Sequence, residues 1–230
     1  MNNSKDINKK SDSVCAIIPF YNEKETLNTV LEVTAKFVDY IIAVNDGSND
    51  NLYLEERKKS FVEIIELDKN FGKGGALSVG FEKAVSAGFD YVVTLDADLQ
   101  HDPNYIPELI YNLKVYDIVV GNRLNNLQGM PLQRRLSNKL TSLLLTVKTG
   151  QEIFDSQCGF RAYRRIVLEQ IKTHYSGFEA ESEILIKAAK KGFTIGFIDI
   201  STIYGNEKSK IRPLDAIIGF LRVLFSNANT

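Results

Sequence analysis

The chain has 230 residues, of which 44% are hydrophobic and 25% are charged, so it can bury one sizeable core, and one α/β domain is the expected organisation. Its net charge of −1 argues against a nucleic-acid-binding protein, because basic residues are balanced by acidic ones. Two distant cysteines without metal-ligand spacing, Cys15 and Cys158, are typical of reduced thiols in the cytoplasm. Residues 1–12 are polar, lack the apolar stretch of a signal peptide and are expected to form a disordered tail.

Apolar runs rich in β-branched residues alternate with helical patterns, which indicates a mostly parallel sheet with crossover helices. The predicted strands are Val14–Pro19, Tyr40–Val44, Phe61–Leu67, Tyr91–Leu95 and Asp117–Val120. The predicted helices are Lys24–Phe37, Asn51–Lys59, Gly74–Ala87 and Asn104–Leu113. Ligands of open α/β sheets bind outside the carboxyl ends of the strands, so the residues that follow each strand are the candidates for a site.

The first predicted strand ends in PFYNE, without the glycine-rich turn that a dinucleotide fold needs. Tyr21 offers a ring that can stack on a base, and Glu23 offers a carboxylate to a ribose hydroxyl or a base N–H. The alternative is that Asn22 caps the next helix and Tyr21 packs. Asp46, at the tip of the second strand, is placed to accept an N–H from a nucleobase, although its NDGS setting is equally that of a turn.

The third strand leads into NFGKGGA at the start of a helix. Backbone N–H groups of a glycine-rich helix start, with Lys73 beside them, form a cradle for an anion. The spacing is not that of a Walker loop. A second interpretation, compatible with the first, is that the small residues let this helix lie close to the sheet.

The fourth strand ends in LDADLQ. Asp96 and Asp98 are two residues apart and point to one side of an extended strand end, with Gln100 as a third oxygen ligand. Such ligands suit Mg²⁺ or Mn²⁺ when substrate phosphates complete the coordination shell. The alternative is that the aspartates cap a helix that begins near Pro103. The fifth strand ends in Arg123, which we predict to bind phosphate beside Asp96 and Asp98.

Together PFYNE, NDGS, NFGKGGA, LDADLQ and GNR resemble the family 2 glycosyltransferases of the GT-A fold, over about residues 13–212. The resemblance is strongest to the branch that transfers sugars to polyprenyl phosphates, such as the dolichol-phosphate mannose synthases and their bacterial glucosyltransferase relatives. It implies a nucleoside site and a metal site that holds the donor diphosphate. The nucleoside residues would be Pro19, Tyr21, Glu23 and Asp46, and the metal ligands Asp96, Asp98 and Gln100.

Apolar residues repeat at helical spacing between Met130 and Thr149, with Arg134 and Arg135 on the same segment. Such a helix covers the active site, lies on a membrane surface or packs in the core. Next, DSQCGFR is similar to the DxxxGFR segment of the same branch. For a hydroxyl acceptor Asp155 would be the general base. For a lipid phosphate, which is already ionised, it would position groups around the metal or acceptor. The alternative is that Asp155 only caps a turn ahead of a strand.

The run Phe178–Lys191 is an amphipathic helix whose acidic residues receive no catalytic role, and a last strand is predicted at Phe193–Tyr204. Lys210 and Arg212 follow in a stretch that resembles the family's SKIR loop, which implies contact with donor or acceptor phosphate. The segment 213–230 is predicted to be a C-terminal amphipathic helix with one apolar stripe, too short to span a bilayer. It suits a membrane interface, a membrane-protein partner or a homodimer contact.

The sequence therefore predicts a metal-dependent, inverting glycosyltransferase that uses a GDP- or UDP-linked sugar, with Asp98, Arg123 and Asp155 as its catalytic residues. The expected acceptor is a polyprenyl phosphate at the cytosolic membrane face, reached by peripheral association and contacted by Arg134 and Arg135. The alternative acceptor is a saccharide hydroxyl. A sugar-nucleotidyltransferase would need a glycine-rich loop in place of PFYNE, and a non-catalytic scaffold would be expected to have lost its metal ligands.

Overall fold

The computed structural model describes residues 12–50, 60–125, 132–202 and 213–225. It confirms the predicted α/β class, with one seven-stranded sheet in the order β3-β2-β1-β4-β6-β5-β7. All neighbouring strands are parallel except β6, which runs antiparallel to β4 and to β5. The strands are β1 (Val14–Phe20), β2 (Tyr40–Asn45), β3 (Val62–Glu66), β4 (Tyr91–Thr94), β5 (Ile118–Asn122), β6 (Arg161–Arg164) and β7 (Ile195–Asp199).

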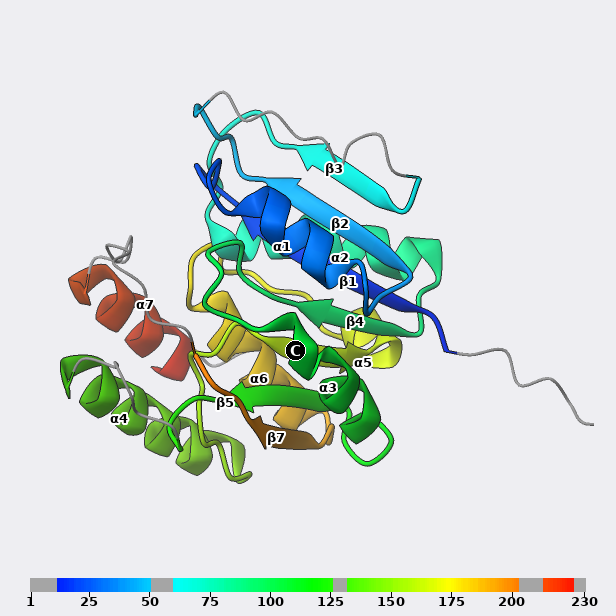
Figure 1. Ribbon diagram of the computed structural model, residues 1–230. Coiled ribbons are helices and arrows are strands. Elements are labelled where there is room, and N and C mark those ends of the chain that lie inside the picture. The colour runs from blue at the N-terminus through cyan, green and yellow to red at the C-terminus, as the bar shows by residue number, and fades with distance from the viewer. Residues whose placement is uncertain (1–11, 51–59, 126–131, 203–212, 226–230) are drawn as a thin grey trace, which may run out of the picture.

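Helices cover both faces of this sheet, with α1 and α3 in front and α2 and α6 behind in the view of Figure 1. Two further helices, α4 and α7, lie side by side beyond the end towards which the parallel strands point. The helices are α1 (Leu27–Thr34), α2 (Lys73–Ala87), α3 (Ile106–Asn112), α4 (Leu132–Thr149), α5 (Arg165–Gln170), α6 (Ala180–Lys190) and α7 (Pro213–Phe225), with a 3-10 turn at Pro103–Tyr105.

The five strands predicted from alternation and β-branching are all present, with ends that differ by one or two residues. β6 and α5 were not predicted, because the sequence RAYR has no apolar run and the strand is held by its two neighbours. The predicted strand at Phe193–Tyr204 is shorter than expected: β7 ends at Asp199, and Thr202 forms only an isolated bridge with His101. The predicted helix Asn51–Lys59 lies outside the described residues.

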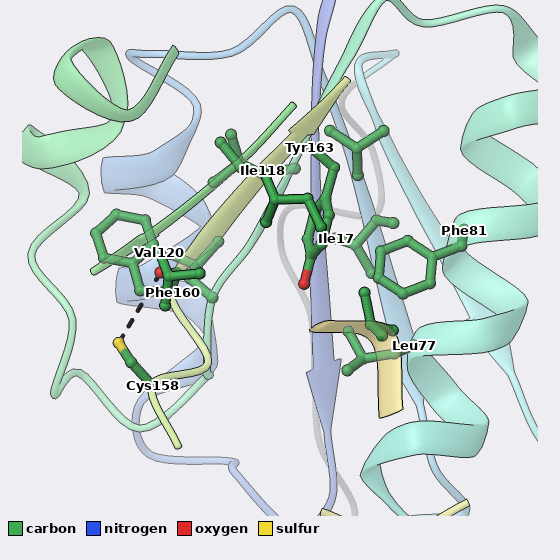
Figure 2. Packing of buried hydrophobic residues seen from close by; sticks show 14 of the residues in the cluster. Ile17, Leu77, Phe81, Ile118, Val120, Cys158, Phe160 and Tyr163 are labelled. Carbon is green, nitrogen blue, oxygen red and sulfur yellow. Dashed lines mark hydrogen bonds between the residues drawn. The ribbon is translucent and has the colours of Figure 1, made fainter. Parts of the chain in front are cut away.

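The core is formed by the central strands and the helices packed on them. Ile17 of β1 lies against Leu77 and Phe81 of α2, and Phe81 meets the ring of Tyr163 edge-on (Figure 2). The approach of α2 to the sheet requires a glycine, since a Cβ on Gly80 would stand 2.5 Å from Ile17 Cγ2. The small residues of this helix therefore do bring it close to the sheet, as the packing interpretation predicted.

The strand order reverses between β1 and β4. From β1 the chain proceeds outward through β2 to β3, and then it returns to place β4 on the other side of β1. The ladder between β1 and β4 ends at Ile17 and Thr94, so the carboxyl-terminal part of β1 pairs only with β2. Such a switch point is where open α/β sheets bind ligands. The segments that follow β1 and β4 are the ones predicted to hold a nucleoside and a metal.

Candidate active site

The loop that follows β4 turns back on itself. Leu99 has a left-handed backbone, φ 61°, which is uncommon for a residue with a side chain and concentrates at functional sites. Asp98 Oδ1 accepts the backbone N–H of Gln100 at 3.1 Å, and His101 Nδ1 accepts that of Asp96 at 3.3 Å. The turn thus returns Gln100 and His101 to the neighbourhood of the two aspartates.

The helix-capping alternative for these aspartates is wrong. Asp102 takes that role instead, because its carboxylate accepts the backbone N–H of Asn104 at 3.0 Å just before Pro103. His101 is buried and stacks on Phe160, with ring centroids 5.3 Å apart, and burial lowers the pKa of its imidazole to about 4. The imidazole is therefore neutral near pH 7, consistent with its acceptor role towards Asp96.

Lys73 connects the loop that follows β4 with helices α2 and α6. Its ammonium lies 2.6 Å from Asp96 Oδ1 and 3.1 Å from Glu181 Oε1, which comes from the first turn of α6. Burial alone would raise the pKa of the Asp96 carboxyl, but the charge of Lys73 lowers it to about 2. Asp96 is therefore ionised at any physiological pH. Glu181, which sequence reasoning left without a role, is a member of this cluster.

The glycine-rich start of α2 uses its backbone differently from the prediction. The N–H of Gly75 donates to the carbonyl of Ser176 at 3.0 Å, and a Cβ on Gly74 would stand 2.7 Å from the carbonyl oxygen of Gly177. The glycines thus let α2 pack on residues 175–177. The predicted anion cradle is consequently reduced to the Lys73 side chain and the remaining first-turn N–H groups.

Asp46, predicted to accept a nucleobase N–H, has partners within the protein. Its two carboxylate oxygens accept the backbone N–H groups of Phe71 (2.7 Å) and Gly72 (2.9 Å). Burial raises the pKa of this carboxyl, and those two N–H groups oppose the rise. The side chain ties the tip of β2 to the loop that carries Lys73, and its contact with a nucleobase stays a prediction.

The other predicted nucleoside residues lie at the end of β1. Pro19 is buried and pairs with Val44 of β2. The pairing of β1 with β4 has already ended at Ile17, so the missing N–H of Pro19 costs no hydrogen bond to β4. Tyr21 and Glu23 are half-buried.

Asn22 does not cap α1, whose N-cap position is Thr26. The N–H of Asn22 donates to Ser48 Oγ at 3.0 Å, and its side-chain oxygen accepts the N–H of Asn49 at 2.9 Å, so these bonds join the loops after β1 and β2.

Arg123 and Asp155 form a buried, two-pronged ion pair. Arg123 Nε donates to Asp155 Oδ2 at 2.7 Å and Nη2 donates to Oδ1 at 3.0 Å. The backbone N–H groups of Arg123 (3.3 Å) and Gln157 (3.1 Å) donate to the same carboxylate, which is fully buried. Burial would raise the pKa of Asp155, but Arg123 and these N–H groups lower it. The carboxylate accepts four hydrogen bonds, about as many as its lone pairs allow.

Arg161 has a structural role that sequence reasoning missed. Its guanidinium is fully buried and donates to the carbonyls of Ser156 (2.9 Å), Cys158 (2.6 Å) and Glu181 (2.8 Å). It therefore holds the loop that carries Asp155 against the first turn of α6. The signal was present in the DSQCGFR segment, but nothing in the sequence distinguishes an arginine that binds phosphate from one that binds carbonyls.

Helix α4 is amphipathic, but its polar face points towards the protein and most of its apolar face points away. Its inward face carries Asn138, Thr141 and Ser142, all buried, and Ser142 Oγ accepts the N–H of Ser156 at 3.0 Å. Leu145 is fully buried and Leu144 is half-buried against the core, but the other leucines point away from the protein. The exposed set is Leu132 (68%), Leu136 (62%), Leu140 (58%), Leu143 (60%) and Val147 (78%), which we call the α4 apolar face. The core-packing interpretation of this stripe is therefore wrong.

Several predicted residues are not placed by the structure. The side chain of Arg134, and Lys210 and Arg212 entirely, lie outside the described residues, whereas Arg135 is half-buried on α4. The C-terminal segment forms α7, whose Phe220, Val223 and Leu224 are buried. Of the members of its predicted apolar stripe whose side chains are described, Leu224 is buried, whereas Leu221 and Phe225 are exposed. Its contact with a homodimer or membrane partner stays a prediction.

The donor set of the β4 loop suits a hard divalent cation. Two carboxylates, Asp96 and Asp98, and the amide of Gln100 are oxygen ligands of the kind that Mg²⁺ and Mn²⁺ prefer. The described residues contain no group of three or more His, Cys, Asp or Glu side chains placed to hold a metal ion. A cation here would consequently depend on Gln100 and on substrate oxygens besides the two aspartates.

A mostly parallel sheet with one antiparallel strand, β6, inserted between β4 and β5, and an acidic loop at its switch point, has the GT-A fold. The sequence model for glycosyl transferase family 2 matches residues 15–172. The chain belongs to this family, as its motifs predicted.

Relatives agree with that assignment. The chain is 36% identical to a UDP-N-acetylglucosamine–dolichyl-phosphate N-acetylglucosaminyltransferase of Methanococcus voltae, over 89% of this chain and 90% of the relative. It is 37% identical to an undecaprenyl-phosphate 4-deoxy-4-formamido-L-arabinose transferase of Proteus mirabilis, over 70% of this chain, and the match spans about half (52%) of that relative. These names confirm the resemblance to the polyprenyl-phosphate branch.

Solved structures share the fold. Glucosyl-3-phosphoglycerate synthase of Mycobacterium tuberculosis, crystallised with Mn²⁺, uridine diphosphate and phosphoglyceric acid, superposes with a TM-score of 0.70 at 20% identity, over 93% of this chain and 76% of that one. Among the described residues of our chain, no helix combines the length and apolar character needed to cross a bilayer.

Proposed function

We propose that this enzyme transfers a sugar from a nucleotide-diphosphate sugar, UDP- or GDP-linked, to a polyprenyl phosphate at the cytosolic face of the membrane, with inversion by direct displacement and with a divalent metal ion. The observation that carries the proposal is the state of Asp155. Its carboxylate accepts four hydrogen bonds, two of them from the Arg123 guanidinium, and its pKa is lowered. It is therefore a poor proton acceptor for an attacking hydroxyl.

A phosphate acceptor needs no general base. The second pKa of a phosphomonoester is about 6, so a polyprenyl phosphate is largely ionised near neutral pH and attacks as an anion. Asp155 then acts as a positioning residue that keeps Arg123 in place. Burial raises the pKa of Asp96, whereas Lys73, His101 and Arg123 lower it, so the Arg123 guanidinium lies close enough to belong to the same site as the loop after β4.

On the donor side, Asp96, Asp98 and Gln100 would hold Mg²⁺ or Mn²⁺. The metal supplies a positive charge that stabilises the leaving diphosphate. Lys73 and Arg123 add preorganised positive charge near Asp96. Pro19, Tyr21, Glu23 and Asp46, at the ends of β1 and β2, form the nucleoside end of this site.

On the acceptor side, the α4 apolar face supports membrane association. A monomer in water gains nothing by exposing five large apolar side chains along one helix while burying Asn138, Thr141 and Ser142 beneath them. A helix with this arrangement lies in the interface of a bilayer, with basic residues beside the apolar stripe. Arg134 and Arg135 of α4 are assigned to the acceptor phosphate, and Lys210 and Arg212 to donor or acceptor phosphate.

The names of the relatives support the same acceptor class. Two of them are transferases of dolichyl phosphate and undecaprenyl phosphate, and one of these uses UDP-N-acetylglucosamine. The crystallised fold neighbour, with its Mn²⁺ and uridine diphosphate, supports a metal-bound uridine donor.

The test is a transfer assay with radiolabelled nucleotide sugars, UDP- and GDP-linked, in the presence of Mg²⁺ or Mn²⁺. One set of reactions contains polyprenyl phosphate in vesicles and a parallel set contains soluble saccharides. We expect label in the organic phase only with the lipid phosphate, and no transfer after chelation with EDTA. Label that enters only the saccharides would overturn the acceptor assignment and restore Asp155 as the leading base. Transfer that persists in EDTA would overturn the metal dependence.

A further inference from the structure

We infer that Glu181 is a positioning residue of the donor site, which shares the ammonium of Lys73 with Asp96 and so leaves uncompensated negative charge beside a divalent cation. The inference rests on the proposed function, because it concerns the same metal loop. Three elements that are far apart in the sequence meet here. Lys73 begins α2, Asp96 follows β4 and Glu181 lies in the first turn of α6.

The ammonium of Lys73 is shared between two carboxylates. It lies 2.6 Å from Asp96 Oδ1 and 3.1 Å from Glu181 Oε1, and the side chains of Lys73, Asp96 and Glu181 are 14%, 29% and 6% exposed. Glu181 is the most deeply buried of the three. Glutamate is almost never buried to this degree unless its charge is paired. The cluster is a built arrangement rather than a chance surface contact.

Gly159 leaves the space in which the cluster assembles. A Cβ at this position would stand 2.5 Å from Lys73 Nζ, 2.9 Å from Asp96 Oδ2 and 3.0 Å from Glu181 Oε1. A larger residue at position 159 would clash with all three charged groups, and it would therefore push the Lys73 ammonium away from both carboxylates. The backbone of Glu181 is held as well, since its carbonyl accepts a hydrogen bond from the buried Arg161 at 2.8 Å.

The charges of the cluster explain why a second carboxylate is needed. Lys73 stands at the amino end of α2, where the helix dipole disfavours a cation, so it needs strong negative partners. With Asp96 alone, the ion pair would be neutral and the carboxylate would offer a divalent cation little charge. Glu181 brings the three groups to a net charge of −1, which leaves Asp96 able to serve Lys73 and a metal ion together.

The experiment measures Mn²⁺ affinity directly, by the electron paramagnetic resonance signal of free Mn²⁺, on the full-length protein with and without UDP. Glu181→Gln keeps the shape of the side chain and removes its charge. We expect Mn²⁺ binding to weaken by about 10-fold to 100-fold, the range typical of residues that orient metal ligands. Lys73→Met is expected to tighten Mn²⁺ binding by at least about fivefold, which is the effect of one unit charge on another about 4 Å away even at the dielectric constant of water.

The double variant separates this role from a purely structural one. If Glu181 acts through Lys73, then adding Lys73→Met to Glu181→Gln restores Mn²⁺ affinity to at least the wild-type level, whereas a damaged site would stay weak. Glu183→Gln is the matched control. It removes a buried carboxylate two residues away on the same helix, which pairs with Lys187 and the backbone N–H groups of His174 and Tyr175. Its Mn²⁺ affinity is expected to equal that of the wild type.

The outcomes are distinguishable. Wild-type protein that binds no Mn²⁺ even with UDP would overturn the metal site, and with it the inference. If the wild type binds Mn²⁺, two results would overturn the inference alone. One is a Glu181→Gln variant that binds Mn²⁺ as tightly as the wild type, and the other is a double variant that still binds Mn²⁺ weakly. If circular dichroism shows that Glu181→Gln does not fold, the Lys73→Met variant decides, because weaker Mn²⁺ binding without the ammonium contradicts the proposal.

Discussion

Helices α2 and α4 are the two longest in the described part of the chain, and they bury opposite kinds of residue. Towards the sheet α2 places Ala76, Leu77, Phe81 and Ala84, all buried and apolar. Towards the protein α4 places mainly Asn138, Thr141 and Ser142, with Leu145 as its fully buried apolar residue. Leu144 is half-buried against the core, and the remaining leucines of α4 point away.

The difference follows from what each helix packs against. α2 lies on the apolar strand β1, whereas α4 lies on the loop of Asp155 and Ser156, whose polar groups need partners. The inward face of α4 is therefore polar because the loop of Asp155 and Ser156 is polar, and its apolar residues are left for another environment. Amphipathic spacing shows that a helix has two faces, but the neighbour decides which face is inward.

The largest expected effect comes from a substitution in the polar loop on which α4 packs. Asp155→Asn would set an amide against the buried Arg123 guanidinium, and leaving one partner of a buried pair uncompensated costs about 3–5 kcal/mol of the free energy of unfolding. Urea denaturation measures the loss. The control is Glu169→Gln in the exposed pair with Arg165, where a change of about 0–1 kcal/mol is expected. Equal effects in the two variants would contradict the structural role of the buried pair.

Neighbouring leucines on α4 test the direction of its faces. Leu145→Ala, at a fully buried position, is expected to cost about 2–5 kcal/mol in stability. Leu143→Ala, 60% exposed in the α4 apolar face, is expected to change stability by less than about 0.5 kcal/mol. On vesicles containing anionic lipid the order reverses: Leu143→Ala should weaken binding by about tenfold, since insertion of a leucine is worth about 1.5–3 kcal/mol.

Sedimentation with vesicles measures that binding, and Tyr111→Ala supplies the control because Tyr111 is exposed on α3, away from α4. Vesicle binding that is unaffected by changes in the α4 apolar face would contradict membrane association through this helix.

A smaller effect in free energy is expected for Asp98→Asn, which tests the metal loop beside α2. The substitution removes charge at nearly constant shape, so the melting temperature should stay close to that of the wild type. Metal-dependent binding of the nucleotide sugar should fall by at least about 100-fold, given that even indirect partners of a ligand are worth about 10-fold to 100-fold. Isothermal titration with and without Mn²⁺ measures the loss. Metal-dependent binding as tight as in the wild type would rule out Asp98 as a ligand.

The smallest expected effect is on acid stability. The folded pKa of Asp96 is about 2, below its ordinary value of 3.8, so its ion pair contributes stability that is fully present above about pH 4. That contribution, on the order of 1–2 kcal/mol, is lost as the pH falls towards 2. Lys73→Met should reduce this pH dependence in denaturation experiments between pH 2 and 5. An unchanged profile would show that Lys73 does not set the pKa of Asp96.

The sequence by itself determined the five strands β1 to β5 and the family. Strands such as Tyr91–Leu95 are continuous apolar runs, and the polar residues that follow them fall at one edge because parallel strands end together. Asp96 and Lys73 were thus predicted to belong to one site, and the ion pair between them confirms that they meet.

Tertiary structure alone decided the partners and the directions. Nothing local indicates that Glu181 meets Lys73, that Asp155 is saturated by Arg123 or that the leucines of α4 face outward, because each depends on contacts between segments far apart in the chain. β6 likewise becomes a strand only because β4 and β5 flank it. Periodicity and residue type are local properties, whereas burial and pairing belong to the folded chain.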